Sequence, residues 1–183
     1  YGSGAYLKAV DELAIFQGNF MHNGAGSQGG AFYITNSLNV TLAQSLFLSN
    51  FAQHEGGALY IFLSAEFYSI LSIQESDFTF NEAKQEGAVI VLDGAKEMSL
   101  SHSQIKDSSS TKALNIHSAQ LLFHNVTIRS YNIGKYVIGS VVKTKPILQS
   151  LKFICPFLTY LKSEESRSCN KLGKCEDLTL YYK

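Results

Sequence analysis

Apolar and small residues recur along the chain in short matching segments, and no helical periodicity is sustained. The segment 29–34 reads Gly-Gly-Ala-Phe-Tyr-Ile, and the segment 56–61 reads Gly-Gly-Ala-Leu-Tyr-Ile. Weaker copies stand at 2–7, 86–91 and 112–116. Self-similarity at a period of about 20–50 residues is typical of a solenoid, in which each repeat stacks on the next.

A second element, Phe-x-x-Asn, precedes the clear copies of the first. Its apolar position predicts a column of Phe16, Phe47 and Phe78, continued by Ile105, Ile128 and Phe153. Its polar position predicts a column of Asn19, Asn50 and Asn81. Further apolar residues stand five and seven positions before this column, and a small residue often stands two before it. The five-before set is Leu42, Ile73, Leu100, Phe123 and Leu148, and the seven-before set is Val40, Leu71, Met98 and Leu121.

Apolar residues two positions apart indicate strands with one buried face. Each repeat therefore predicts two short strands joined by a bend, with a third strand in the Gly-Gly-Ala segment. The chain is expected to be all-β, a parallel β-helix of about five to six rungs over residues 1–154, followed by a Cys-containing segment at 155–183. Equal positions of stacked rungs form ladders, so the phenylalanines are expected in the core and the asparagines at a turn.

Two local questions stay open at this level. The paired glycines indicate a tight corner, either through a positive φ or through close approach of a neighbouring rung. Both faces of the Gly-Gly-Ala strand are apolar, so the pattern does not decide which face is buried. If Tyr33 and Tyr60 face outward, they form an adhesive patch.

The pairing of Gly-Gly-Ala-apolar with Phe-x-x-Asn resembles the polymorphic outer-membrane protein repeat of chlamydial adhesins. Similar repeats occur in bacterial adhesins and in large surface proteins of ciliates and algae. Residues 2–91 carry the pattern, and 98–156 carry it by extension. The resemblance implies a right-handed, pectin-lyase-like β-solenoid at a cell surface or outside the cell, with no shared catalytic residues.

All three cysteines, Cys155, Cys169 and Cys175, lie in the last 29 residues. The run Cys155-Pro156-x-x-Thr159-Tyr160, with Cys169 following, is similar to the small cysteine-rich modules that follow solenoids in ciliate surface proteins. An odd count leaves one thiol unpaired or a partner beyond Lys183. Disulfides imply an oxidising, extracellular setting, whereas the alternative is three reduced cysteines in the cytosol. The cysteines include no Cys-x-x-Cys pair, so a zinc site is not predicted.

Charge changes this picture in one respect. The chain has 15 basic and 15 acidic residues, so the formal charge is zero and only 16% of residues are charged, against about 25% in a typical domain. Without a basic excess, nucleic-acid binding is not expected. A neutral surface of Ser, Thr, Asn and Gln tends to associate, so self-association is expected, end to end or laterally. The longest weakly charged stretch, 58–73, is too short for a membrane-spanning segment of about 20 residues.

Carbohydrate lyases and hydrolases also use this fold, and their sites need clustered carboxylates. The aspartates are scattered instead, and the glutamates near turns are expected to be solvated. His22 and His54 occupy similar turn positions where a stacked pair could hold a metal, although a surface role is preferred. We predict no catalytic, cofactor or metal site. The residues considered are Asp11, Asp77, Asp93, Asp107, Asp177, Glu55, Glu82, Glu86, Arg129, Arg167, His102, His117 and His124.

Two sequons, Asn39-Val40-Thr41 and Asn125-Val126-Thr127, match the N-glycosylation acceptor. The ladder pattern turns Val40 and Val126 inward, so Asn39 and Asn125 are expected to face solvent. The sequence thus predicts an extracellular structural or surface β-solenoid, either a segment of a larger chain or a subunit of a glycosylated fibre or matrix. The alternatives are an adhesin that binds a glycan or a host surface protein and, more remotely, a polysaccharide lyase or hydrolase.

Overall fold

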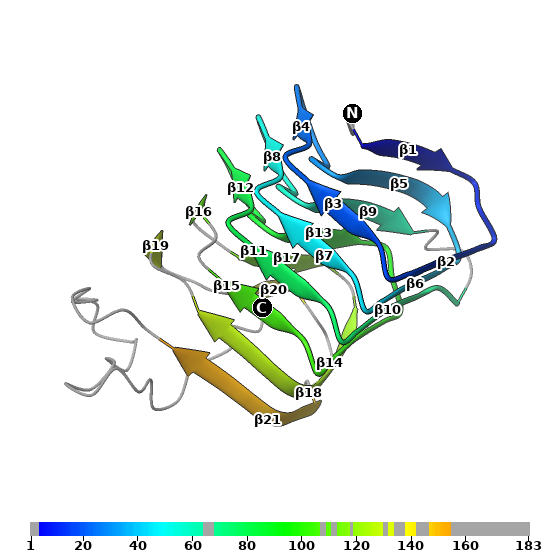
Figure 1. The fold of residues 1–183 in the computed structure, drawn as a ribbon. Coiled ribbons are helices and arrows are strands. Elements are labelled where there is room, and N and C mark those ends of the chain that lie inside the picture. The colour runs from blue at the N-terminus through cyan, green and yellow to red at the C-terminus, as the bar shows by residue number, and fades with distance from the viewer. Residues whose placement is uncertain are drawn as a thin grey trace.

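The computed structural model describes residues 4–63, 68–106, 109–110, 113–117, 119–129, 132–133, 138–141 and 147–154. Strands and the turns between them make up all of these residues, with no helix among them. Every strand pairing within them is parallel, and neighbouring strands in a sheet come from successive repeats. The chain is therefore a parallel β-helix, as its sequence predicts (Figure 1).

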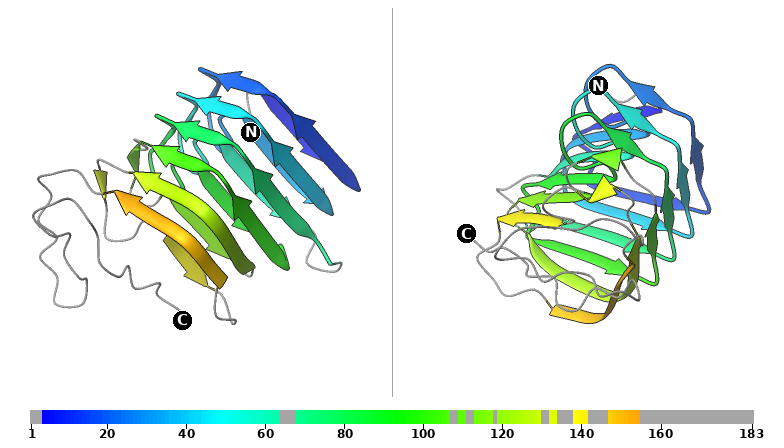
Figure 2. Two further views of the ribbon diagram at one scale, coloured as in Figure 1. Left: turned by 60° about the horizontal axis from the view of Figure 1, so that its bottom comes forward. Right: turned by 90° about the vertical axis from the view of Figure 1, so that its left-hand side faces the viewer.

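Three walls form the solenoid, and each turn of the chain, here called a rung, contributes to all of them (Figure 2). Sheet A is the first wall. In order it contains β1 (Ala5–Lys8), β5 (Phe32–Ser37), β9 (Leu59–Leu63), β13 (Ile90–Asp93), β17 (Leu114–His117) and β20 (Ile138–Val141).

Sheet B bends through a corner and supplies the second wall and part of the third. Its first arm contains β2 (Glu12–Phe16), β6 (Asn39–Ala43), β10 (Ile70–Gln74) and β14 (Glu97–Ser101), and its second arm contains β3 (Asn19–Met21), β7 (Leu46–Leu48), β11 (Asp77–Thr79) and β15 (Gln104–Lys106). The longer strands β18 (Gln120–Arg129) and β21 (Ile147–Ile154) pair side by side and run through both arms. Sheet C completes the rung with β4 (Gly24–Ala25), β8 (Phe51–Ala52), β12 (Glu82–Ala83), β16 (Ser109–Ser110) and β19 (Asn132–Ile133).

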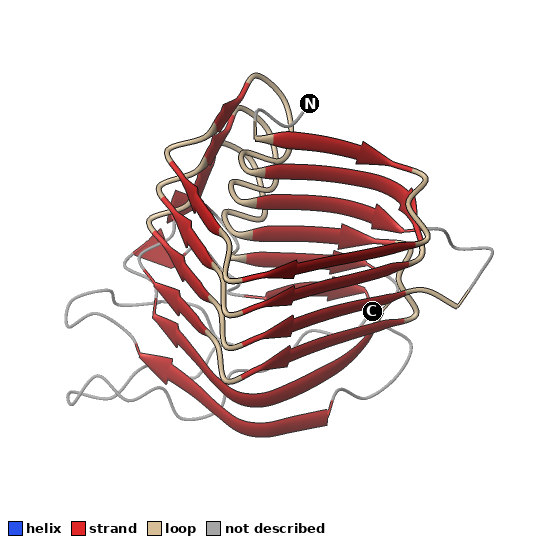
Figure 3. Cartoon of the chain, turned by 45° about the vertical axis from the view of Figure 1, so that its right-hand side comes forward, coloured by secondary structure: helices blue, strands red, loops and turns tan. Residues whose placement is uncertain are grey.

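The strands stack rung upon rung (Figure 3). Their inward residues form the core. Leu42 pairs with Ile73 and Ile73 with Leu100, and all three are fully buried. The columns predicted five and seven residues before the Phe position are thus confirmed. On sheet A, Phe32 and Ile34 point inward and are buried, which settles the open question about the Gly-Gly-Ala strand.

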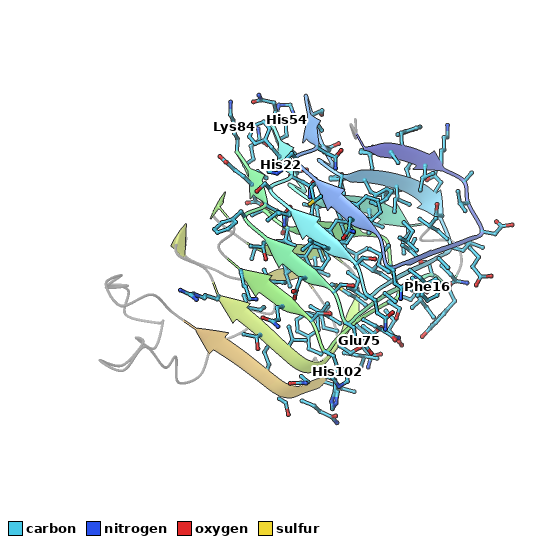
Figure 4. The ribbon with its side chains drawn as sticks, viewed as in Figure 1. Phe16, His22, His54, Glu75, Lys84 and His102 are labelled. Atoms are coloured by element: carbon cyan, nitrogen blue, oxygen red, sulfur yellow. The ribbon has the colours of Figure 1, made fainter. Side chains whose placement is uncertain are left out.

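The predicted phenylalanine column is wrong in its first member. Phe20, not Phe16, pairs with Phe47, which in turn pairs with Phe78. Phe16 pairs with Ala43 and is 65% exposed (Figure 4). Two Phe-x-x-Asn segments stand in tandem at 16–19 and 20–23, and the second stacks because the first two rungs are 27 residues apart rather than 31. The longer spacing belongs to the next pair of rungs, where β9 and β10 are joined by a longer connection.

The asparagine column needs the same correction, because Asn23 takes the place expected for Asn19. Asn23 Nδ2 donates to Asn50 Oδ1 at 2.9 Å, and Asn50 Nδ2 donates to Asn81 Oδ1 at 3.0 Å. Asn50 and Asn81 are fully buried, whereas Asn19 lies exposed in β3 opposite Leu46. The ladder itself is confirmed, with its first member displaced by four residues.

The paired glycines fill both of the roles that the sequence leaves open. Gly56 has φ +68°, a left-handed conformation that favours glycine. Gly57 lies where a Cβ would overlap the carbonyl oxygens of Ala88 and Glu82 in the next rung. Aligning the weaker copy at 86–91 with 56–61 places Leu59 opposite Val89. The observed register is displaced from this alignment by one residue, because Leu59 pairs with Ile90.

Buried serines close the corner between the two arms of sheet B. Ser45 and Ser76 each donate the hydroxyl to a carbonyl two residues earlier, at 2.9 and 2.7 Å. Each hydroxyl oxygen also accepts the backbone N–H of the preceding rung: Ser45 accepts from Gly18 at 3.1 Å, and Ser76 accepts from Ser45 at 3.2 Å. Ser103 continues the series by accepting from Ser76. These serines satisfy N–H groups that the bend removes from the strand ladder.

The last described strand, β21, ends at Ile154. The expected Cys-containing segment at 155–183, with Cys155, Cys169 and Cys175, lies outside the described residues.

Candidate functional site

A ladder of tyrosines stands on the outer face of sheet A. Tyr6, Tyr33 and Tyr60 occupy one register column, hereafter the tyrosine ladder. The rings of Tyr33 and Tyr60 stack with centroids 5.1 Å apart and an interplanar angle of 4°, and those of Tyr6 and Tyr33 stack at 5.4 Å and 21°. Their outward direction follows from the alternation of the strand, since Phe32 and Ile34 face the core. The structure thus places Tyr33 and Tyr60 in the surface patch that was one of the two expectations.

Two carboxylates lie one above the other at the turn that enters sheet A. Glu55 and Glu86 are bridge partners on neighbouring rungs, and both are half-buried. Gln28 Nε2 donates to Glu55 Oε2 at 3.0 Å, and Asn115 Nδ2 donates to Glu86 Oε2 at 2.9 Å. A side chain of another rung thus donates to each of these acids, Gln28 from a turn and Asn115 from β17, whereas Glu82 is exposed.

The surroundings of Tyr60 favour its neutral form. Burial raises the pKa of Tyr60 above its ordinary value, and the charges of Glu55, Tyr33 and Asp93 raise it further, in that order. A hydrogen bond with Gln28 acts in the opposite direction. The tyrosine ladder therefore lies beside negative charge.

This pKa shift predicts a loss of stability at alkaline pH. The folded chain holds the Tyr60 proton more tightly than the unfolded chain does. The contribution of Tyr60 to the free energy of unfolding is therefore constant below the pKa of about 10 in the unfolded chain. It falls as pH rises through the higher pKa in the folded chain. Urea unfolding at pH about 9 and about 11 should show a smaller decline for Tyr60→Phe than for the unsubstituted chain. Equal declines in the two chains would contradict this assignment.

The acids considered for catalysis lie on different walls. Asp11 precedes β2, Asp77 begins β11, and Asp93 ends β13. Arg129 ends β18, while Asp107, Arg167 and Asp177 lie outside the described residues. Within the described ranges, no group of three or more His, Cys, Asp or Glu side chains could hold a metal ion.

The histidines are arranged differently from the expectation. His22 lies at the corner before the asparagine ladder with φ +56°, whereas His54 lies later in the turn, where its ring nitrogen is 3.4 Å from the Ser27 hydroxyl (Figure 4). The two thus occupy different positions of the rung and do not stack as register partners. His102 directly follows β14 and His124 lies in the neighbouring strand β18, and their ring centroids are 5.1 Å apart.

Both sequons lie on the surface as expected. Asn39 and Asn125 are exposed, whereas Val40 and Val126 are buried. Asn39 begins β6 on the first arm of sheet B. Asn125 occupies the corner of sheet B with φ +51°.

The chain matches no protein-family model, no curated protein and no solved structure. The part of the chain that the structure describes has no helix long and apolar enough to cross a membrane. A functional assignment therefore depends on the surface of the solenoid itself.

Proposed function

We propose that this protein is an extracellular or cell-surface β-solenoid with a structural role, acting as a segment of a larger chain or as a subunit of a glycosylated fibre or matrix. The observation that carries the proposal is the tyrosine ladder, a row of stacked aromatic rings on the outer face of a sheet. Aromatic side chains that combine an apolar ring with a polar tip are enriched where proteins meet other molecules.

The interior supports a structural role because it gives the surface a fixed spacing. Phenylalanine, asparagine and serine ladders join each rung to the next through side chains as well as backbone. Repeats that contact only their neighbours produce an extended, regular body. Equivalent outward side chains on successive rungs are thus held at a fixed spacing along the solenoid.

Strand edges offer one route to assembly. Among the described strands, β1, β2, β3 and β4 each stand at the end of their column and pair on one side only. An open strand edge can add another strand. A further rung, from the same chain or from another copy, would continue the three walls.

The second candidate function is an adhesin that binds a glycan. Tyr60 lies beside Glu55 and Gln28, so an aromatic ring stands next to carboxylate and amide groups. Sites for small polar ligands combine apolar surface with a few polar groups that fix orientation. Binding of defined oligosaccharides by the chain, lost in Tyr60→Ala and retained in Phe16→Ala, would favour this function over the structural one.

The sequons predict covalent glycans on the native protein. Intact mass before and after enzymatic removal of N-glycans should fall by one glycan for each occupied site. Asn39→Gln and Asn125→Gln should each remove one step, because both side chains are exposed and reachable. Surface labelling of intact cells, with electron microscopy of the native material, tests the location directly. A native chain without glycans that is found only inside the cell would overturn the proposal.

A further inference from the structure

The outer face of sheet A carries opposite charges in one register column, on its first and fourth strands, and β17 and β20 continue the sheet beyond. Lys8 of β1 pairs with Thr35, Thr35 pairs with Phe62, and Phe62 pairs with Asp93 of β13. Lys8 is exposed, Thr35 and Asp93 are half-buried, and Phe62 is 37% exposed. This column runs beside the tyrosine ladder, two residues further along each strand.

The charges of this column are complementary to those of the same column in a second copy whose rungs run in the opposite order. Consider a second copy related by a two-fold axis that lies between the two outer faces, runs parallel to the strands and passes midway between β5 and β9. This operation reverses the order of the rungs and keeps each position along the strand, so β1 faces β13 of the other copy. Lys8 then faces Asp93 twice across the interface, once in each direction.

The same operation brings aromatic side chains together at the centre. Tyr33 of β5 faces Tyr60 of β9, and Thr35 faces Phe62. Packed sheets lie about 10 Å apart, a gap that large side chains from both faces fill and that a lysine and an aspartate can span. Aromatic residues at the centre with charges at the rim are the usual arrangement of a protein interface.

The first arm of sheet B provides a contrast within the same molecule. Its outer column runs from Glu12 through Asn39 and Ile70 to Glu97. A two-fold axis midway between β6 and β10 would place Glu12 against Glu97, and like charges across an interface oppose association. That column also carries the sequon Asn39, whose glycan would occupy the face.

We infer that two copies of this chain associate through the outer faces of sheet A, with their solenoid axes antiparallel. The tyrosine ladders lie at the centre of this interface, and reciprocal Lys8–Asp93 ion pairs lie at its rim. The inference rests on the proposed self-associating structural role, because it assigns the face that such a protein uses laterally.

Charge reversal provides the test. Sedimentation equilibrium of the full chain at low ionic strength should show a dimer. Lys8→Asp and Asp93→Lys should each weaken it at least about tenfold, since each change creates two like-charge contacts. An equimolar mixture of the two variants should recover the dimer, because every contact between unlike chains is again between opposite charges. Lys84→Asp and Glu82→Lys, which change exposed charges in sheet C and directly after it, should leave the dimer unchanged.

Three results would overturn the inference: a monomeric unsubstituted chain, a dimer indifferent to both reversals, or a mixture that stays monomeric. Cellular location is measured separately, so its outcome does not depend on this test. A monomeric chain found at the cell surface would reject the interface and retain the proposed function. A dimer that is weakened by each charge reversal and recovered in the mixture, from a chain confined inside the cell, would support the interface and reject the proposed function.

Discussion

Replacing Phe47 with alanine is expected to lower the free energy of unfolding by about 3–5 kcal/mol, the range for truncating a buried aromatic residue. Phe47 is fully buried between two stacked neighbours, with ring centroids 4.7 Å from Phe78 and 5.0 Å from Phe20. The truncation removes both stacking contacts and leaves a cavity in the middle of the column. Urea unfolding followed by circular dichroism measures the change.

Phe16→Ala is the matched control for this experiment. Phe16 is 65% exposed on the outer face of β2, so its loss should change the free energy of unfolding by no more than about 0.5 kcal/mol. A loss at Phe16 as large as the loss at Phe47 would place both residues in the core, as the sequence predicts, and would contradict the observed register.

The second large effect is expected at Asn50, whose side chain is fully hydrogen-bonded in the buried ladder. Its Oδ1 accepts from the backbone N–H and Nδ2 of Asn23 at 3.1 and 2.9 Å. Its Nδ2 donates to the carbonyl of Phe20 at 2.9 Å and to Asn81 Oδ1 at 3.0 Å. Asn50→Ala should cost about 3 kcal/mol, because it leaves buried acceptors without donors.

Two further variants separate hydrogen bonding from packing at this position. Asn50→Asp preserves the shape but replaces the Nδ2 donor with an acceptor beside Phe20 O and Asn81 Oδ1, so it should destabilise at least as much as alanine. Asn19→Ala should have little effect, because Asn19 is exposed. If Asn50→Asp were as stable as the unsubstituted chain, the ladder would not be held by these bonds.

The sequence predicts most of the solenoid because the offset between two sequence repeats is also the strand register between two neighbouring rungs. Residues at equal positions of two rungs become neighbours, so lining up Val40 with Leu71 and Met98 already gives their pairing. The first rung fails for a physical reason. Phe16 and Phe20 both begin a Phe-x-x-Asn segment, and only the lengths of the connections between strands decide which one reaches the core.

Less of the candidate site could be predicted from the sequence. Both faces of the Gly-Gly-Ala strand are apolar, so local alternation could not decide that Phe32 and Ile34 are buried and Tyr33 faces outward. The contact between Gln28 and Glu55 joins side chains 27 residues apart in turns, outside the strands whose alternation the sequence pattern describes. The repeat spacing, once corrected by the 27-residue interval, would have brought Gln28 and Glu55 together.

The serine corner gives the solenoid a chemical direction. Each hydroxyl gives its proton to its own rung and accepts the N–H of the rung before it, so the corner of Ser45 is completed by Ser76 and not the reverse. The asparagine ladder has the same sense, since the backbone N–H of Asn50 is accepted by Asn81. A serine removed from one rung therefore leaves an unpaired backbone N–H in the preceding rung and none in the following rung.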